Sequence, residues 1–130
     1  MSTLRTQELT KAYGKVLAVD LDEVEAHYAI YPPGSGYNRH RDRFRDNDAS
    51  SSAGSSRILS LVCYLNDDWR EADGGALRLH LDPDAPEEGG TVDVWPQAGS
   101  SICFLSELEH EVLPATRERL SIAAWFRRGR

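Results

Sequence analysis

The feature that most constrains the fold of this chain is a succession of short apolar segments separated by turn residues. Each segment is rich in β-branched and aromatic residues and is bounded by Gly, Pro, Asn, Asp or Ser, which is the pattern of β-strands. Helical spacing of apolar residues indicates at most one short helix, within residues 1–15. Short strands with so little helix predict an all-β sandwich or barrel. The predicted strands are residues 25–31, 37–42, 57–65, 76–81, 91–95, 100–105, 110–113 and 119–126.

Alternation along the longer segments gives each predicted strand two different faces. In residues 119–126 the odd positions carry Arg, Ser, Ala and Trp, whereas the even positions are all apolar. Residues 57–65 divide in the same way, with Ser60 and Tyr64 opposite a leucine-rich side. Successive side chains of a strand point to opposite faces of the sheet. The sequence therefore predicts sheets that are apolar on their outer face and that surround a polar pocket with the inner one.

Length and charge limit the organisation of the chain. At 130 residues it is long enough for a single domain, which we place at residues 25–130 after a lead-in of residues 1–24. The net charge of −6 argues against a nucleic-acid footprint spread over the surface. Positive charge is nevertheless dense in residues 39–45, where an arginine recurs at every second position. This stretch is either a solvated strand face or part of a substrate groove.

The cysteines and the apolar runs bear on the compartment. Cys63 and Cys103 each lie inside an apolar run, which favours free buried thiols in a reducing compartment over a disulfide. No apolar run approaches the roughly 18 to 20 residues that span a bilayer, and the start of the sequence has no apolar signal-peptide core. We therefore expect a cytoplasmic protein with no membrane partner.

His40 and Asp42 are two residues apart in a strand-like stretch, so both side chains point to one side of the chain. His110 is the best candidate for a third ligand, because it follows a turn and opens a predicted strand. Two imidazoles and one carboxylate on one side of a metal form the facial triad of non-haem Fe(II) oxygenases. The other histidines, His27 and His80, have no comparable neighbours and are expected to be structural or exposed.

Arg119 begins the last predicted strand on its polar face. An unpaired guanidinium that points inward is costly, and an anionic ligand would relieve that cost. The planar fork of arginine suits a carboxylate. Tyr64, on the inner face of residues 57–65, could add its hydroxyl to the same carboxylate.

Four motifs in the order found here resemble those of the prolyl 4-hydroxylase branch of the Fe(II)/2-oxoglutarate-dependent dioxygenases, close to the hypoxia-factor prolyl hydroxylases and their bacterial relatives. The motifs are YPPGSGYNRHRD, RILSLVCYLNDDW, GGALRL and HEVLPATRERLSIAAWF, and the resemblance covers residues 25–127. It implies a double-stranded β-helix (jelly-roll or cupin-like) core of eight strands.

The resemblance also implies roles for individual residues. His40, Asp42 and His110 would hold Fe(II) at the catalytic centre, and Arg119 and Tyr64 would bind the distal carboxylate of 2-oxoglutarate. O2 would be the oxidant, with ascorbate as an optional reductant. The resemblance places Tyr31 beside the cosubstrate. The residues that it implies around the substrate are Tyr37, Arg57, Leu77 and Trp125.

By the same resemblance the chain hydroxylates a prolyl residue of a protein or peptide while 2-oxoglutarate is decarboxylated to succinate. One alternative is the same chemistry on a small molecule such as a free amino acid, and another is a non-catalytic metal-binding β-barrel module. A third, nucleic-acid dealkylation, is disfavoured because enzymes of that type resemble one another in a second arginine where this chain has Trp125.

Two regions depart from the pattern of that branch. Its members carry helices ahead of the core that cover one sheet, whereas the lead-in here is short. Either the protein is minimal or another chain covers the outer apolar face, which favours a homo-oligomer. The second departure is the Ser-rich stretch of residues 46–56, which has the composition of a surface loop and leaves the identity of the substrate open.

Overall fold

The computed structural model describes residues 21–43, 56–82, 84 and 89–128, which form β-strands and one 3-10 turn, η1 (Glu71–Asp73). All eight predicted strands are present, and the largest difference is at the first, which begins at Leu21 and not at residue 25. The predicted helix in residues 1–15 and nearly all of the Ser-rich stretch lie outside the described residues. The strands are β1 (Leu21–Tyr31), β2 (Tyr37–His40), β3 (Arg57–Tyr64), β4 (Leu77–His80), β5 (Thr91–Val94), β6 (Ser101–Leu105), β7 (His110–Val112) and β8 (Arg119–Arg128).

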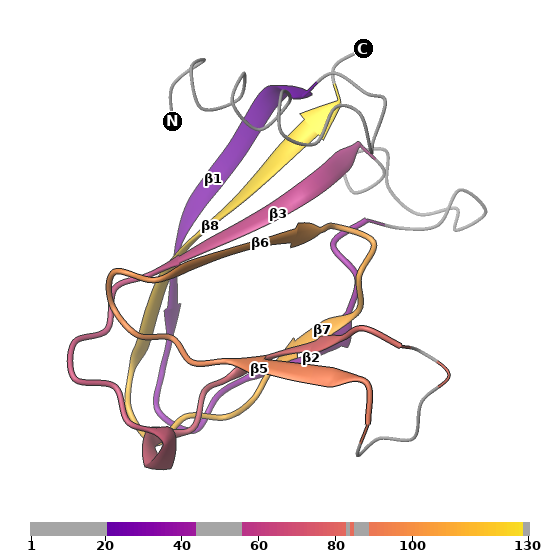
Figure 1. Cartoon of the computed structure of the whole chain (residues 1–130). Coiled ribbons are helices and arrows are strands. Elements are labelled where there is room, and N and C mark those ends of the chain that lie inside the picture. The colour runs from indigo at the N-terminus through magenta and orange to yellow at the C-terminus, as the bar shows by residue number, and fades with distance from the viewer. Residues whose placement is uncertain (1–20, 44–55, 83, 85–88, 129–130) are drawn as a thin grey trace.

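The strands form two four-stranded antiparallel sheets that face each other (Figure 1). The orders are β1-β8-β3-β6 in one sheet and β2-β7-β4-β5 in the other, so most consecutive strands cross from one sheet to the opposite one. This alternation is the topology of a double-stranded β-helix, and the predicted fold class is confirmed. Within the described ranges no helix has the length and apolar character needed to cross a membrane.

The core between the sheets is built from buried apolar side chains of both. Leu77 and Leu79 of β4 and Val112 of β7 pack with Phe104 of β6, and each is at most 9% exposed. Burying a side chain of this size stabilises the fold by about 1.5–3 kcal/mol. Because three of the four, Leu77, Phe104 and Val112, also line a cavity, the core supplies its apolar wall.

The outer face of the first sheet carries a second apolar cluster, as the alternation predicts. At one end of this face Leu59 and Phe126 are at most 1% exposed and pack with Leu21, among others. Further along the same face, Tyr28 and Ile122 pair across β1 and β8 and are 57% and 37% exposed. The face is therefore covered at one end and open to solvent at the other.

A buried asparagine joins the end of β3 to the start of β8. The side-chain amide of Asn66 donates to the carbonyl oxygens of Pro96 at 2.8 Å and Leu120 at 3.0 Å, and its oxygen accepts from the Leu120 amide at 2.7 Å. The Leu120 carbonyl also accepts from the Leu65 amide at 3.3 Å, so the Asn66 side chain completes a buried hydrogen-bond network. Asn66 thereby fixes the backbone next to Arg119, the first residue of β8.

Candidate active site

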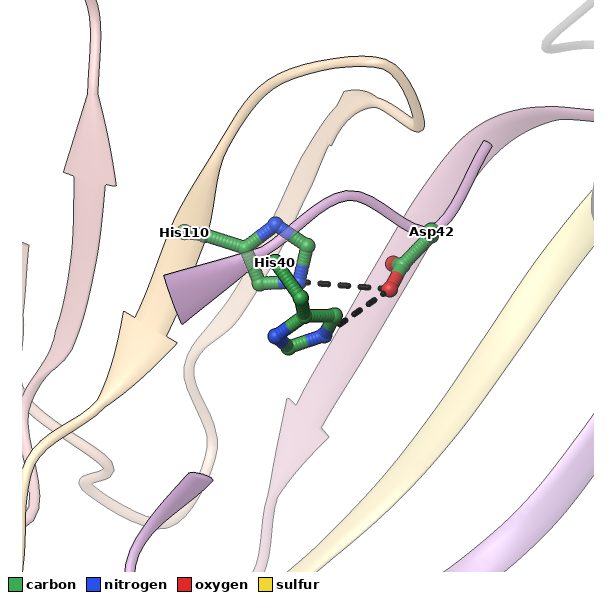
Figure 2. Close-up of side chains that lie close together, drawn as sticks. All are labelled: His40, Asp42 and His110. Atoms are coloured by element: carbon green, nitrogen blue, oxygen red, sulfur yellow. Dashed lines mark ion pairs between the residues drawn. The ribbon is translucent and has the colours of Figure 1, made fainter. Parts of the chain in front are cut away.

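Pairing of β2 with β7 brings two of the three predicted metal ligands together. His40 lies directly opposite His110 in the register of the two strands, and their ring centroids are 4.3 Å apart. Asp42 follows the end of β2, where its backbone amide donates to the carbonyl of Ser106 at 2.9 Å. Figure 2 shows both imidazoles directed at one carboxylate oxygen of Asp42.

Both imidazoles are held so that the same nitrogen faces the centre. Nδ1 of His40 lies 2.7 Å from the carbonyl oxygen of Asn38, and Nδ1 of His110 lies 2.8 Å from that of Leu108. A carbonyl only accepts, so each Nδ1 carries the hydrogen and each Nε2 presents a lone pair in the neutral ring. This is the orientation that a metal-bound histidine adopts when its second nitrogen is tied to the backbone.

The two oxygens of Asp42 have different partners. Oδ2 accepts hydrogen bonds from the Ser60 hydroxyl at 2.6 Å and from the Trp125 indole at 2.9 Å. Oδ1 lies 3.2 Å from Nε2 of His40 and 3.3 Å from Nε2 of His110. Burial favours the protonated carboxyl, but hydrogen bonds with His110 and His40 outweigh it, so the pKa of Asp42 lies well below its usual value.

The spacing of the three side chains fits a divalent ion. One ligand atom from each of His40, Asp42 and His110 lies within 4.8 Å of the others. An ion about 2.1 Å from two ligands at right angles separates them by about 3 Å, close to the 3.2 and 3.3 Å found here. The donor set of two nitrogens and one carboxylate oxygen is the one that non-haem Fe(II) sites use.

Arg119 and Tyr64 form a second polar group in the same cavity. The guanidinium is 2% exposed, donates from Nε to the Gly75 carbonyl at 2.8 Å, and lies over the rings of Tyr31 and Tyr64 at 5.4 and 5.2 Å. No carboxylate in the described part of the chain pairs with it. The buried Tyr64 hydroxyl likewise has no hydrogen-bond partner there, and burial raises its pKa to about 12. A buried cation without a carboxylate partner, next to a buried hydroxyl without any hydrogen-bond partner, fits a bound carboxylate.

Gly75 shapes the floor beneath Arg119. Its φ of 74° is in the left-handed region, and a Cβ at this position would lie 2.9 Å from the Trp69 ring and 3.4 Å from Cδ of Arg119. A larger residue would therefore strain the backbone and clash with the Trp69 ring. The glycine serves the site as well as the turn, which the sequence alone did not indicate.

The residues that the sequence singled out surround one cavity of about 390 Å³ between the two sheets. It runs along the inner face of β8, whose residues Arg119 and Trp125 both line it. These two are separated by about 20 Å of strand at 3.3 Å per residue. The other lining residues that the sequence analysis named as candidate ligands or contacts are Tyr31, Tyr37, His40, Asp42, Arg57, Tyr64, Leu77 and His110.

Besides Gly75, two residues of the site were not recognised from the sequence. Ser60 stands on the polar face of β3 and its inward position was visible, but its bond to Asp42 depends on strand pairing. His27 is exposed, as expected, yet it lines the cavity and its ring centroid lies 4.8 Å from that of Trp125. Its place in the inner-facing row of β1 was the available signal. His80, by contrast, pairs with Glu111 at 3.0 Å away from the cavity.

A double-stranded β-helix with a His-Asp-His triad defines a class of metal-dependent oxygenases. The family model described as the 2OG-Fe(II) oxygenase superfamily matches residues 26–127. The chain belongs to this superfamily.

Solved structures give the same result. The chain is similar to a prolyl-4-hydroxylase from Pseudomonas putida, with 46% sequence identity and a TM-score of 0.77 over 95% of this chain and 63% of that one. It is also similar to a prolyl hydroxylase from Trichoplax adhaerens, whose structure holds a peptide fragment of the hypoxia inducible factor oxygen degradation domain, with 28% identity and a TM-score of 0.72 over 94% of this chain and 52% of that one. The chain thus spans less than two thirds of the length of either protein.

Replacing Ser60 with Ala should weaken divalent metal binding by about 10–100-fold, because Asp42 loses the hydroxyl that orients its carboxylate. Anaerobic titration with Mn(II), followed by electron paramagnetic resonance, measures this affinity without turnover. Ser101→Ala, at an exposed position of β6, is the matched control and should bind as the wild type does. Equal affinity of Ser60→Ala and wild type would show that the bond does not position the ligand.

Metal affinity should fall as the pH is lowered. Burial opposes the charged imidazolium of His110, but the hydrogen bond with Asp42 outweighs it and raises the pKa of His110 above 6.5. A protonated imidazole cannot bind metal, so affinity should be constant above that pKa and decline by about tenfold per pH unit below it for each proton displaced. The same Mn(II) titration at a series of pH values measures this, and a flat profile through mildly acidic pH would contradict it.

Proposed function

We propose that the chain is an Fe(II)/2-oxoglutarate-dependent dioxygenase that hydroxylates a prolyl residue of a protein or peptide. The observation that carries this proposal is the presence of two groups in one cavity: the His-Asp-His triad, and Arg119 without a carboxylate partner beside Tyr64, whose hydroxyl has no hydrogen-bond partner among the described residues. The similarity to two prolyl hydroxylases supports the choice of substrate class.

In this proposal His40, Asp42 and His110 hold Fe(II), and Arg119 with Tyr64 binds the distal carboxylate of 2-oxoglutarate, beside Tyr31. Iron and 2-oxoglutarate, when bound, supply the activation of O2. The protein keeps Asp42 ionised through its hydrogen bonds, so the metal finds a ready anionic ligand. Burial raises the pKa of the Tyr31 and Tyr64 phenols, which therefore remain protonated donors at neutral pH.

Substrate would be placed by the residues near the triad. Leu77, together with the core residues Phe104 and Val112, gives the cavity an apolar wall that excludes water from the reacting centre. Tyr37 is 53% exposed and its ring lies 4.1 Å from that of His40, so the metal centre is close to solvent on this side. An open side of this kind favours a polypeptide substrate over a small molecule enclosed in a pocket.

Further parts of the proposal concern the surroundings of the enzyme. Cys63 and Cys103 are free and half-buried, which supports a cytoplasmic location. The exposed apolar end of the outer sheet face supports a homo-oligomer. The oxygenase domain, predicted as residues 25–130 after a lead-in of residues 1–24, is proposed to begin at Leu21, because β1 starts there and Leu21 is buried. Ascorbate is retained as an optional reductant. Trp125 donates to Asp42 where nucleic-acid dealkylating enzymes have an arginine, which supports a partner other than nucleic acid.

With Fe(II), 2-oxoglutarate and air, the protein should form succinate and add one oxygen atom to proline-containing peptides, as measured by mass spectrometry. His110→Ala should abolish both, because the ligand set drops to two. His80→Ala, whose histidine pairs with Glu111 away from the cavity, is the matched control and should retain activity. Full activity of His110→Ala would refute the ligand assignment, and succinate without an oxygenated peptide would refute the substrate class.

Arg119→Ala should raise the 2-oxoglutarate concentration needed for half-maximal succinate formation by on the order of 10–100-fold, because a charge-assisted bidentate contact is lost. Mn(II) affinity should stay near that of the wild type. Arg78→Ala, which breaks only the ion pair with Asp93, provides the control. Equal loss of metal binding and of 2-oxoglutarate response would mean that Arg119 supports the fold and not the cosubstrate.

A further inference from the structure

Trp125 joins the metal centre to a charged cluster at the side of the cavity where the triad lies. Its indole nitrogen donates to Asp42, while its ring lies 4.0 Å from the guanidinium carbon of Arg57 and 4.8 Å from the ring centroid of His27. Arg57, His27 and Trp125 all line the cavity, and so does the exposed Tyr37. We call these four residues the mouth of the cavity.

Arg57 is held in a fixed orientation and retains free donors. Its Nε donates to Glu25 at 2.9 Å, and the guanidinium stacks on Trp125, so two contacts from different strands fix its plane. Across the described ranges, neither terminal nitrogen of Arg57 has an acceptor. The side chain is 22% exposed and therefore reachable. A planar guanidinium with two free N–H groups at its end is suited to a carboxylate.

The acidic residues near the mouth do not neutralise the arginines around it. Glu25 contacts two of them, Arg57 at 2.9 Å and Arg127 at 4.0 Å, and the hydrogen bond from Arg57 holds the pKa of Glu25 below its usual value. Glu25 and its two arginines together therefore carry one positive charge in excess.

Glu109 is shared in the same way by Arg39 and by Arg41, the latter at 2.7 Å. Arg41 lines the cavity, so the stretch of alternating arginines contributes to the site as well as to the solvated surface. Among the described residues that line the cavity, Asp42 is the one acid, and it is committed to the triad. This local excess of positive charge occurs in a chain with a net charge of −6, so it does not follow from composition.

We propose that the mouth binds an acidic side chain close to the target residue of the polypeptide substrate, with Arg57 as the group that receives its carboxylate. This inference rests on the proposed function and adds the chemical class of the recognised segment. Stacking on Trp125 fixes where that carboxylate must lie, at the side of the triad, so recognition of the acid would also place the neighbouring residue over the metal centre.

The test uses a random peptide library with one fixed proline, presented under nitrogen to immobilised protein loaded with Mn(II) and 2-oxoglutarate, so that binding is measured without oxidation. Sequencing of the retained pool should show enrichment of Asp and Glu near the proline. Arg57→Gln should lose this enrichment, and Arg57→Lys should keep part of it, because the charge remains while the planar fork is lost. Arg78→Gln, outside the cavity, is the matched control and should enrich as the wild type does.

One peptide from the wild-type pool is synthesised in two forms, one with its acid and one with the matching amide. The wild type should bind the amide form about tenfold more weakly than the acid form, whereas Arg57→Gln should bind both forms equally well. The preference should shrink as salt is added. The inference would be overturned if the wild type retained no peptide or a pool without enrichment of Asp and Glu. It would also be overturned if Arg57→Gln and Arg57→Lys both enriched Asp and Glu as the wild type does.

The same peptides, exposed to Fe(II) and air, separate this inference from the proposed function. Acidic peptides that bind without gaining oxygen would refute hydroxylation and leave the recognition of acids standing. Peptides that gain oxygen with no preference for acids would refute the role of Arg57 alone.

Discussion

The register between β2 and β7 is the constraint on which the site depends. It places His40 directly across from His110, although seventy positions separate them in the chain. A shift of one residue in either strand would turn one imidazole to the opposite face of its sheet. The amide of Asp42, bonded to Ser106 immediately before the turn that leads to His110, ties the third ligand to the same pair of strands. Backbone hydrogen bonds between distant segments therefore set the positions of His40, Asp42 and His110.

The two halves of the cavity differ in how many of their buried polar atoms have hydrogen-bond partners. Around Asp42 every polar atom has a partner: one carboxylate oxygen accepts from Ser60 and Trp125, and the other faces the imidazoles. Around Arg119, in the described residues, the buried guanidinium has no carboxylate partner and the Tyr64 hydroxyl has no hydrogen-bond partner. An unsatisfied buried polar group costs about 1–3 kcal/mol. The three candidate metal ligands are thus prearranged, whereas the end of the cavity at Arg119 and Tyr64 is left to be completed by what binds there.

Much of this arrangement could be read from the sequence because strands alternate. The odd positions of residues 119–126 were assigned to the inner face, and Arg119 and Trp125 line the cavity. What could not be read depends on which strands are neighbours. Ser60 meets Asp42, and Gly75 fits beneath Arg119, through contacts between segments far apart in the chain. The sequence around His27 shows no partner for it, because its neighbour Trp125 lies on the adjacent strand β8.

The two ends of the cavity differ in their exposure to solvent, and this difference bears on the order in which molecules can bind and leave. Arg119 is 2% exposed, whereas Tyr37, beside the metal centre, is 53% exposed. A long chain seated over Tyr37 and Trp125 obstructs the route by which a small diacid would travel inward. In the proposed function the small molecule would therefore bind first and the polypeptide second, and the small product would leave only after the large one.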